Sequence, residues 1–94
     1  MFFDLSGWKI LVVGCGRIAR RRIQTLLGFD PGQILVVARE TDGMPAEWED
    51  LPNMKICRRA YQTGDLEGCR MVIAATDDAD LNGRISDECR RRQI

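Results

Sequence analysis

A short glycine-containing segment carries the clearest sign of chemistry in this sequence. Residues 14–19 read Gly-Cys-Gly-Arg-Ile-Ala, which fits the spacing G-x-G-x-x-G/A. Gly14 would permit a tight turn, Gly16 would let a pyrophosphate approach the backbone, and Ala19 would let a helix pack closely on a strand. A helix N-terminus also offers free N–H groups and a partial positive charge. The segment therefore predicts a binding loop for the pyrophosphate of NAD or NADP.

A second group of polar residues follows an apolar run, where residues 38–42 read Ala-Arg-Glu-Thr-Asp. Glu40 could accept a hydrogen bond from the ribose 2′-OH, which favours NAD, or could simply be a solvated loop charge. Arg39 could instead accommodate a 2′-phosphate, which favours NADP. These residues alone leave the choice of cofactor open.

Short apolar runs, typical of strands, alternate along the chain with segments that have the apolar spacing of helices. Continuous apolar runs predict strands over residues 9–13, 34–38, 54–57 and 71–75. Their lack of apolar–polar alternation is typical of strands that are covered on both faces, as in a parallel sheet. We therefore expect an α/β fold, a Rossmann-like doubly wound parallel sheet with strand order 3-2-1-4.

The helices expected between these strands follow from spacing and from end signals. Four apolar residues at helical spacing predict a helix after residue 16, namely Ala19, Ile23, Leu26 and Leu27. Pro45 could begin a short helix that reaches Trp48, whereas residues 64–68 are expected to be a connection. A last helix is expected from Ala79 to Ile94, with Asp78 as its N-cap.

Length, charge and composition exclude several classes of protein. The 94 residues suit one domain, with a formal net charge of zero. The balanced charge argues against nucleic-acid and anionic-membrane binding. The apolar runs are too short to span a membrane, and the first residues lack a signal-peptide pattern, so we expect a cytoplasmic protein. Without His or a C-x-x-C pair, no metal site is expected.

Several motifs together resemble one family, the precorrin-2 dehydrogenase domain that forms the N-terminal part of siroheme synthase. The matching pieces are residues 4–7 (Asp-Leu-Ser-Gly), residues 10–16, the stretch 18–22, residues 65–68, and Val-Ile-Ala-Ala-Thr-Asp-Asp at 72–78 with Leu81 and Asn82. The last piece is the most specific, and the resemblance covers nearly the whole chain.

The resemblance implies an NAD-dependent enzyme that oxidises precorrin-2 to sirohydrochlorin in siroheme biosynthesis, and a homodimer for the full-length protein. Carried over to this chain, the cofactor contacts are Gly14, Gly16, Arg17, Ile18, Arg39, Glu40, Ala75, Thr76 and Asp77. The last three lie toward the nicotinamide side.

This sequence departs from the family pattern at two places. Cys15 stands where the family usually has Gly. The family's catalytic Asp lies on the strand that follows the last helix, so it is expected beyond Ile94 and no catalytic residue is assigned within residues 1–94. We therefore expect residues 1–94 to be an incomplete part of a longer protein, lacking the next strand of the sheet.

Two other interpretations remain open. The chain could be the NADP-binding domain of another dehydrogenase, of the shikimate or glutamyl-tRNA reductase type, which Arg39 would suit. It could also be a non-catalytic nucleotide-sensing module. The stretch at residues 74–78 favours the siroheme synthase family over both.

Overall fold

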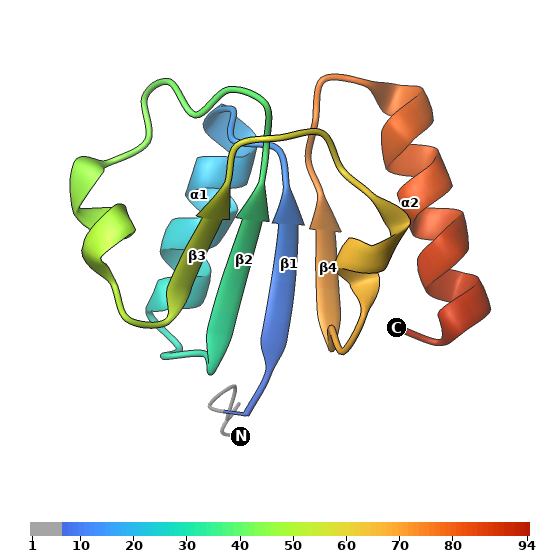
Figure 1. Cartoon of the computed structure of the whole chain (residues 1–94), viewed down its shortest axis with the longest axis horizontal. Helices are drawn as coiled ribbons and strands as arrows, with labels where there is room; N and C mark the ends of the chain where they lie inside the picture. The colour runs from blue at the N-terminus through green and yellow to red at the C-terminus, as the bar shows by residue number, and fades with distance from the viewer. Residues whose placement is uncertain (1–6) are drawn as a thin grey trace.

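A sheet of four parallel strands forms the centre of the computed structural model, which describes residues 7–94 (Figure 1). The strand order is β3-β2-β1-β4. The strands are β1 (Lys9–Val13), β2 (Gln33–Val37), β3 (Met54–Cys57) and β4 (Met71–Ala74). Two α-helices, α1 (Arg17–Leu27) and α2 (Ala79–Arg92), and two 3₁₀ helices, η1 (Ala46–Asp50) and η2 (Thr63–Leu66), connect them. The predicted fold class and strand order are confirmed.

The two faces of the sheet are buried against different elements, because successive side chains of a strand point to opposite faces. Ile10 and Val12 of β1 pack with α1 and with Trp48 of η1. Leu11 and Val13 pack on the other face, with Leu66 of η2 and Ile85 of α2. Both faces are thus covered, which explains why the central strands carry unbroken apolar runs.

The ends of three elements differ from the expectation. The second and fourth strands, β2 and β4, end at Val37 and Ala74, one residue earlier than expected. The last helix was predicted to reach Ile94, but it ends at Arg92 because Gln93 takes a left-handed conformation with φ of +58°. The N–H of Gln93 then bonds the Arg90 carbonyl and that of Ile94 bonds the Cys89 carbonyl, the Schellman pattern of helix ends. This turn brings Ile94 onto the core beside α2.

One element was missed: η2 (Thr63–Leu66) overlaps residues 64–68, which were expected to be a connection. The expectations for residues 4–6 lie outside the described residues, and the further strand expected after Ile94 stays a prediction. Within residues 7–94, no helix has the length and apolar character needed to cross a membrane.

The sheet opens a crevice at the carboxyl ends of its central strands. Helix α1 leads from β1 to β2 on one face, whereas η2 leads into β4 on the other face. The chain also leaves β4 through α2 on that other face, so it leaves the neighbouring strands β1 and β4 on opposite faces of the sheet. Such a switch point is where doubly wound sheets bind nucleotides. All four arrowheads in Figure 1 point to this edge.

Candidate dinucleotide-binding site

The turn after β1 is held by contacts with both neighbouring strands. The Gly14 N–H donates to the Val37 carbonyl at 2.9 Å, and the Ala75 N–H donates to the Val13 carbonyl at 3.0 Å. Gly14 has a φ of +108°, and a Cβ at this position would lie 2.6 Å from the Ala75 carbonyl oxygen. The first glycine of the loop is therefore required by backbone conformation and by the close approach of the segment after β4.

The N-terminus of α1 is open to the crevice and has no capping partner in the described chain. The first helical bond runs from the Arg20 N–H to the Gly16 carbonyl at 2.9 Å. No side chain among residues 7–94 caps the helix, and its first turn holds no acidic residue. A Cβ placed on Gly16 would meet nothing within 4 Å. The free N–H groups of the first turn and the open space at Gly16 fit a pyrophosphate.

Cys15, the residue that departs from the family pattern, is a buried residue of the turn after β1. Its side chain is buried, and the residue is not among those with positive φ. The position therefore does not need a glycine backbone. Burial raises the pKa of the Cys15 thiol, and the nearby Arg20 and Arg58 oppose this shift only in part. The thiol is therefore protonated at neutral pH and poorly reactive.

The turn between β4 and α2 is tied by one asparagine. Asn82 accepts from the Thr76 N–H at 3.2 Å and donates from Nδ2 to the Thr76 carbonyl at 3.0 Å, and the Thr76 hydroxyl lies 2.6 Å from its Oδ1. Asp78 caps α2 by accepting from the Leu81 N–H at 3.1 Å, as predicted. Asp77 is exposed and forms no hydrogen bond in this turn. The motif at residues 72–82, the most specific of the sequence, thus fixes the conformation of this turn through the hydrogen bonds of Asn82.

A cleft of about 1040 Å³ lies along the carboxyl edge of the sheet. It brings together seven of the nine predicted cofactor residues, namely Gly14, Gly16, Arg39, Glu40, Ala75, Thr76 and Asp77. Ile18 does not line this cleft but lines a smaller cavity beside β4, which also includes Thr76 and Arg22. Arg17 is exposed and lines neither.

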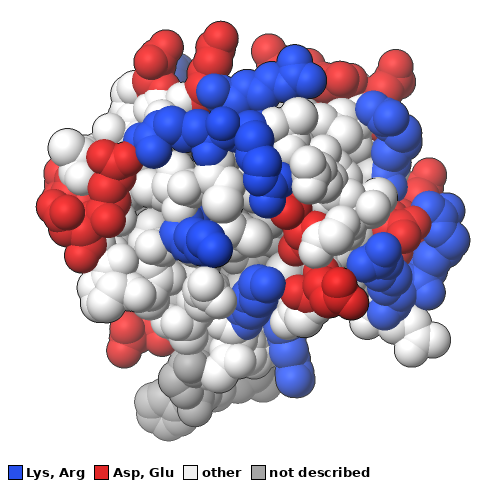
Figure 2. Space-filling model, viewed as in Figure 1, with Lys and Arg blue, Asp and Glu red and all other residues white. Residues whose placement is uncertain are grey.

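Arg39 and Glu40 follow directly after β2 and are both exposed. Neither side chain has an ion pair or hydrogen bond in the part of the chain that the structure describes. Figure 2 shows basic and acidic side chains mixed along the upper edge of the molecule, where the strands end. The charges at this edge therefore act locally rather than as one field of a single sign.

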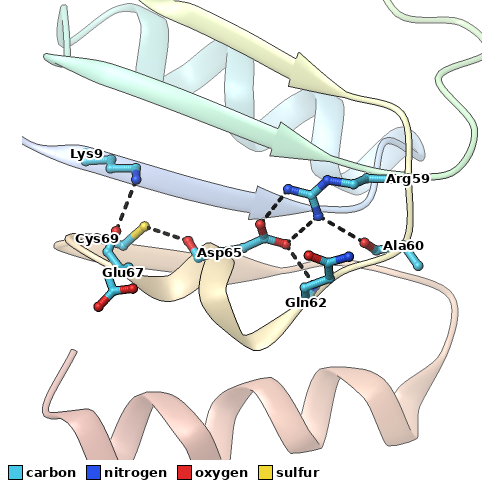
Figure 3. Close-up of polar contacts among 7 residues, drawn as sticks. All are labelled: Lys9, Arg59, Ala60, Gln62, Asp65, Glu67 and Cys69. Carbon is cyan, nitrogen blue, oxygen red and sulfur yellow. Dashed lines mark hydrogen bonds and ion pairs between the residues drawn. The ribbon is translucent and has the colours of Figure 1, made fainter.

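Sequence reasoning missed an ion pair at the cleft, between Arg59 and Asp65. Figure 3 shows the Arg59 side chain extending from the segment after β3 toward Asp65 on η2. Nη1 and Nη2 donate to the two carboxylate oxygens at 2.9 and 2.6 Å, and the Gln62 N–H donates to Oδ2 at 2.8 Å. Arg59 could have been noticed because it follows a strand at the carboxyl edge. Asp65 lies in the piece at residues 65–68 that resembles the family, but no role was assigned to it because η2 was not predicted.

The Arg59–Asp65 pair makes stability depend on pH. Hydrogen bonding to Arg59 holds the pKa of Asp65 below its ordinary value of about 3.9, despite the burial of the carboxyl group. The folded state is therefore stabilised by this group above that pH, and the stabilisation is lost as the pH falls through the lowered pKa.

We expect Asp65→Asn to lower the free energy of unfolding by about 2 kcal/mol at pH 7, because a hydrogen-bonded charge is lost. Urea denaturation at pH 7 and at pH 3 measures this difference, which should be smaller at pH 3. The exposed Asp50→Asn is the matched control, because Asp50 lies outside the first turn of any helix. If the difference in the free energy of unfolding between Asp65→Asn and the wild type were as large at pH 3 as at pH 7, the assigned direction of the Asp65 pKa shift would be wrong.

The fold and the site define an NAD(P)-binding module, and comparison with known proteins agrees. Residues 1–94 match the model of the family NAD_binding_7, described as "Putative NAD(P)-binding". The chain belongs to this family.

Siroheme synthases and a precorrin-2 dehydrogenase are among the proteins similar to this chain. The chain is 43% identical to a siroheme synthase of Pseudomonas entomophila over 100% of its own length and 20% of the relative's. It is 46% identical to a siroheme synthase of Pseudomonas putida (strain W619), over 92% of the chain and 18% of the relative. The solved structure of SirC, a precorrin-2 dehydrogenase, matches with a TM-score of 0.80 and 32% identity, over 92% of this chain and 43% of that one. The chain thus spans about a fifth of the length of the curated relatives it matches.

Proposed function

We propose that residues 1–94 act as the dinucleotide-binding domain of an NAD-dependent precorrin-2 dehydrogenase, which oxidises precorrin-2 to sirohydrochlorin. The observation that carries this proposal is the convergence of two motifs on one cleft. The glycine loop and the Thr76 turn, tied by Asn82, line the same carboxyl edge of the sheet. The similarity to siroheme synthases and to SirC supports the substrate.

In this proposal the backbone does most of the cofactor binding. The N–H groups at Gly16, Arg17 and Ile18 would hold the pyrophosphate, which explains how Arg17 and Ile18 can serve although their side chains lie outside the cleft. Arg39 and Glu40 would meet the adenosine ribose. Ala75, Thr76 and Asp77 would lie toward the nicotinamide, which supplies the hydride acceptor when bound.

The proposed localisation of the protein is the cytoplasm. The four cysteines carry free thiols, which suits a reducing compartment. The homodimer proposed for a longer form of the protein can be tested by light scattering on that form.

A second candidate function is an NADP-binding domain of another dehydrogenase. The side chain of Arg39 favours it, since it is exposed at the cleft and has no partner within residues 7–94, and a guanidinium suits a 2′-phosphate. A nucleotide-sensing module without catalysis would bind the cofactor equally well but would oxidise no substrate.

Titration with both cofactors tests the preference for NAD. We expect NAD to bind more tightly than NADP, since Glu40 can accept from the free 2′-OH. Arg39→Ala should leave the NAD affinity within about twofold and weaken any NADP binding selectively. Calorimetry gives both constants. Tenfold tighter binding of NADP, about 1.4 kcal/mol, would reverse the assignment.

Catalysis is expected to need more than residues 1–94. Hydride transfer requires the nicotinamide and the substrate carbon in near-attack geometry, together with a group that handles the substrate proton. That group is the Asp expected beyond Ile94. We therefore expect residues 1–94 to bind NAD without oxidising precorrin-2, and a form extended through the next strand and downstream segments to oxidise it. NADH absorbance follows both reactions, and equal turnover by the two forms would place the active residues within residues 1–94.

A further inference from the structure

Arg59 uses only part of its hydrogen-bonding capacity on the protein. A guanidinium has five N–H donors. Within residues 7–94, Nη1 donates to Asp65 Oδ2 at 2.9 Å and to the Ala60 carbonyl at 3.1 Å, and Nη2 donates to Asp65 Oδ1 at 2.6 Å. The Nε–H and the second hydrogen on Nη2 remain, and these two donors lie side by side on one edge of the planar group.

The carboxylate of Asp65 holds the guanidinium in one orientation. Its side chain is only 7% exposed, whereas that of Arg59 is 39% exposed. Both carboxylate oxygens bind Arg59, and Oδ2 also accepts from the Gln62 N–H at the start of η2. Asp65 is therefore the buried anchor, and Arg59 is the accessible end of the pair.

The accessible end faces the nucleotide cleft. Arg59 lines it together with Gly14, Gly16 and Thr76. Cys57 also lies near the guanidinium, but a thiol is only a weak hydrogen-bond acceptor. Two parallel N–H donors match the geometry of a carboxylate or a phosphate, which they can bind in a bidentate manner.

We propose that Arg59 binds an oxyanion in this cleft through Nε and Nη2, and that Asp65 is the positioning residue that fixes the guanidinium. This inference rests on the proposed function, because the oxyanion is either a phosphate of the dinucleotide or a carboxylate of the tetrapyrrole. Arrangement of the donors before binding reduces the conformational entropy lost when the ligand binds.

The test separates ligand binding from a purely structural role of the pair. The double variant Arg59→Gln with Asp65→Asn replaces the ion pair by two amides, and the new amide oxygen at 65 can still accept from Gln62. Arg59→Lys keeps the charge but loses the planar fork. Arg58→Gln is the matched control, because Arg58 pairs with Glu49 and does not line the cleft. Thermal unfolding checks the fold of each variant.

Calorimetric titrations with NAD, ADP, adenosine and sirohydrochlorin give the affinities. For a phosphate contact, we expect the double variant to bind NAD and ADP about tenfold more weakly, with adenosine unchanged. For a carboxylate contact, the loss should appear with sirohydrochlorin alone. In either case Arg59→Lys should lose several-fold in affinity, and Arg58→Gln should stay within about twofold.

Three outcomes would overturn the inference. A folded double variant with unaltered affinity for all four ligands would show that the Arg59–Asp65 pair has a structural role only. Full affinity in Arg59→Lys would exclude the bidentate contact. A wild-type protein that binds neither NAD nor sirohydrochlorin would overturn the proposed function as well, which distinguishes the two failures.

Discussion

Replacing Gly14 with Ala is expected to lower the free energy of unfolding by about 4 kcal/mol. A φ of +108° is strained for any residue with a Cβ, and such strain costs roughly 1–3 kcal/mol. The added Cβ would also lie 2.6 Å from the Ala75 carbonyl oxygen, so the segment after β4 must move away from β1, at a cost of about 1–3 kcal/mol more. Urea denaturation followed by circular dichroism measures the loss.

Gly83→Ala is the matched control for this substitution. Gly83 lies in α2, and a Cβ there would meet nothing within 4 Å. Because Ala favours a helix more than Gly does, this variant should gain up to about 1 kcal/mol. The same chemical change thus has opposite expected effects at the two positions. Gly14→Ala with a stability within about 1 kcal/mol of the wild type would show that the close approach to Ala75 is not required.

Gly16→Val should abolish most cofactor binding while leaving the fold nearly intact. The backbone of Gly16 has φ of −74° and ψ of −170°, which Val adopts without strain. Its Cβ position is empty in the protein, so the branched side chain would occupy space proposed for the pyrophosphate. We expect an affinity for NAD about a hundredfold weaker, or roughly 2.7 kcal/mol, with the free energy of unfolding changed by less than about 1 kcal/mol.

Calorimetry with NAD measures the effect of Gly16→Val, and Gly64→Val is its control. Gly64 is exposed, has an equally open Cβ position and does not line the cleft. Its variant should bind NAD as the wild type does. A folded Gly16→Val protein with wild-type affinity would show that the glycine loop does not hold the pyrophosphate.

The fold could be predicted from the sequence because its signals are local. Apolar runs such as residues 9–13 determine buried strands, and the 3.6-residue spacing of Ala19, Ile23 and Leu26 determines the inner face of α1. The strand order followed from general rules for parallel strands and their crossovers. The binding loop at residues 14–19 could also be predicted, because its glycines act within that same short segment of the chain.

Part of the candidate site could not be predicted from the sequence, because it depends on the direction in which each side chain points. Gly16, Arg17 and Ile18 are consecutive, yet only Gly16 lines the cleft. Successive residues of a helix point in directions about 100° apart, so neighbours in a motif face different surroundings. The sequence motif identifies the backbone that faces the crevice, but the side chains of its members are placed by how α1 packs on the sheet.

Only the tertiary structure decided which distant polar groups meet. The four residues of η2 are too few to show a periodic pattern, and Asp65 reaches Arg59 only because the segment after β3 crosses to the other side of β1. Asn82 ties Thr76 only because α2 turns back beside β4. Local preferences determine strands and helices, whereas a contact between polar side chains of different elements forms only when packing of the whole core brings their atoms within hydrogen-bonding distance.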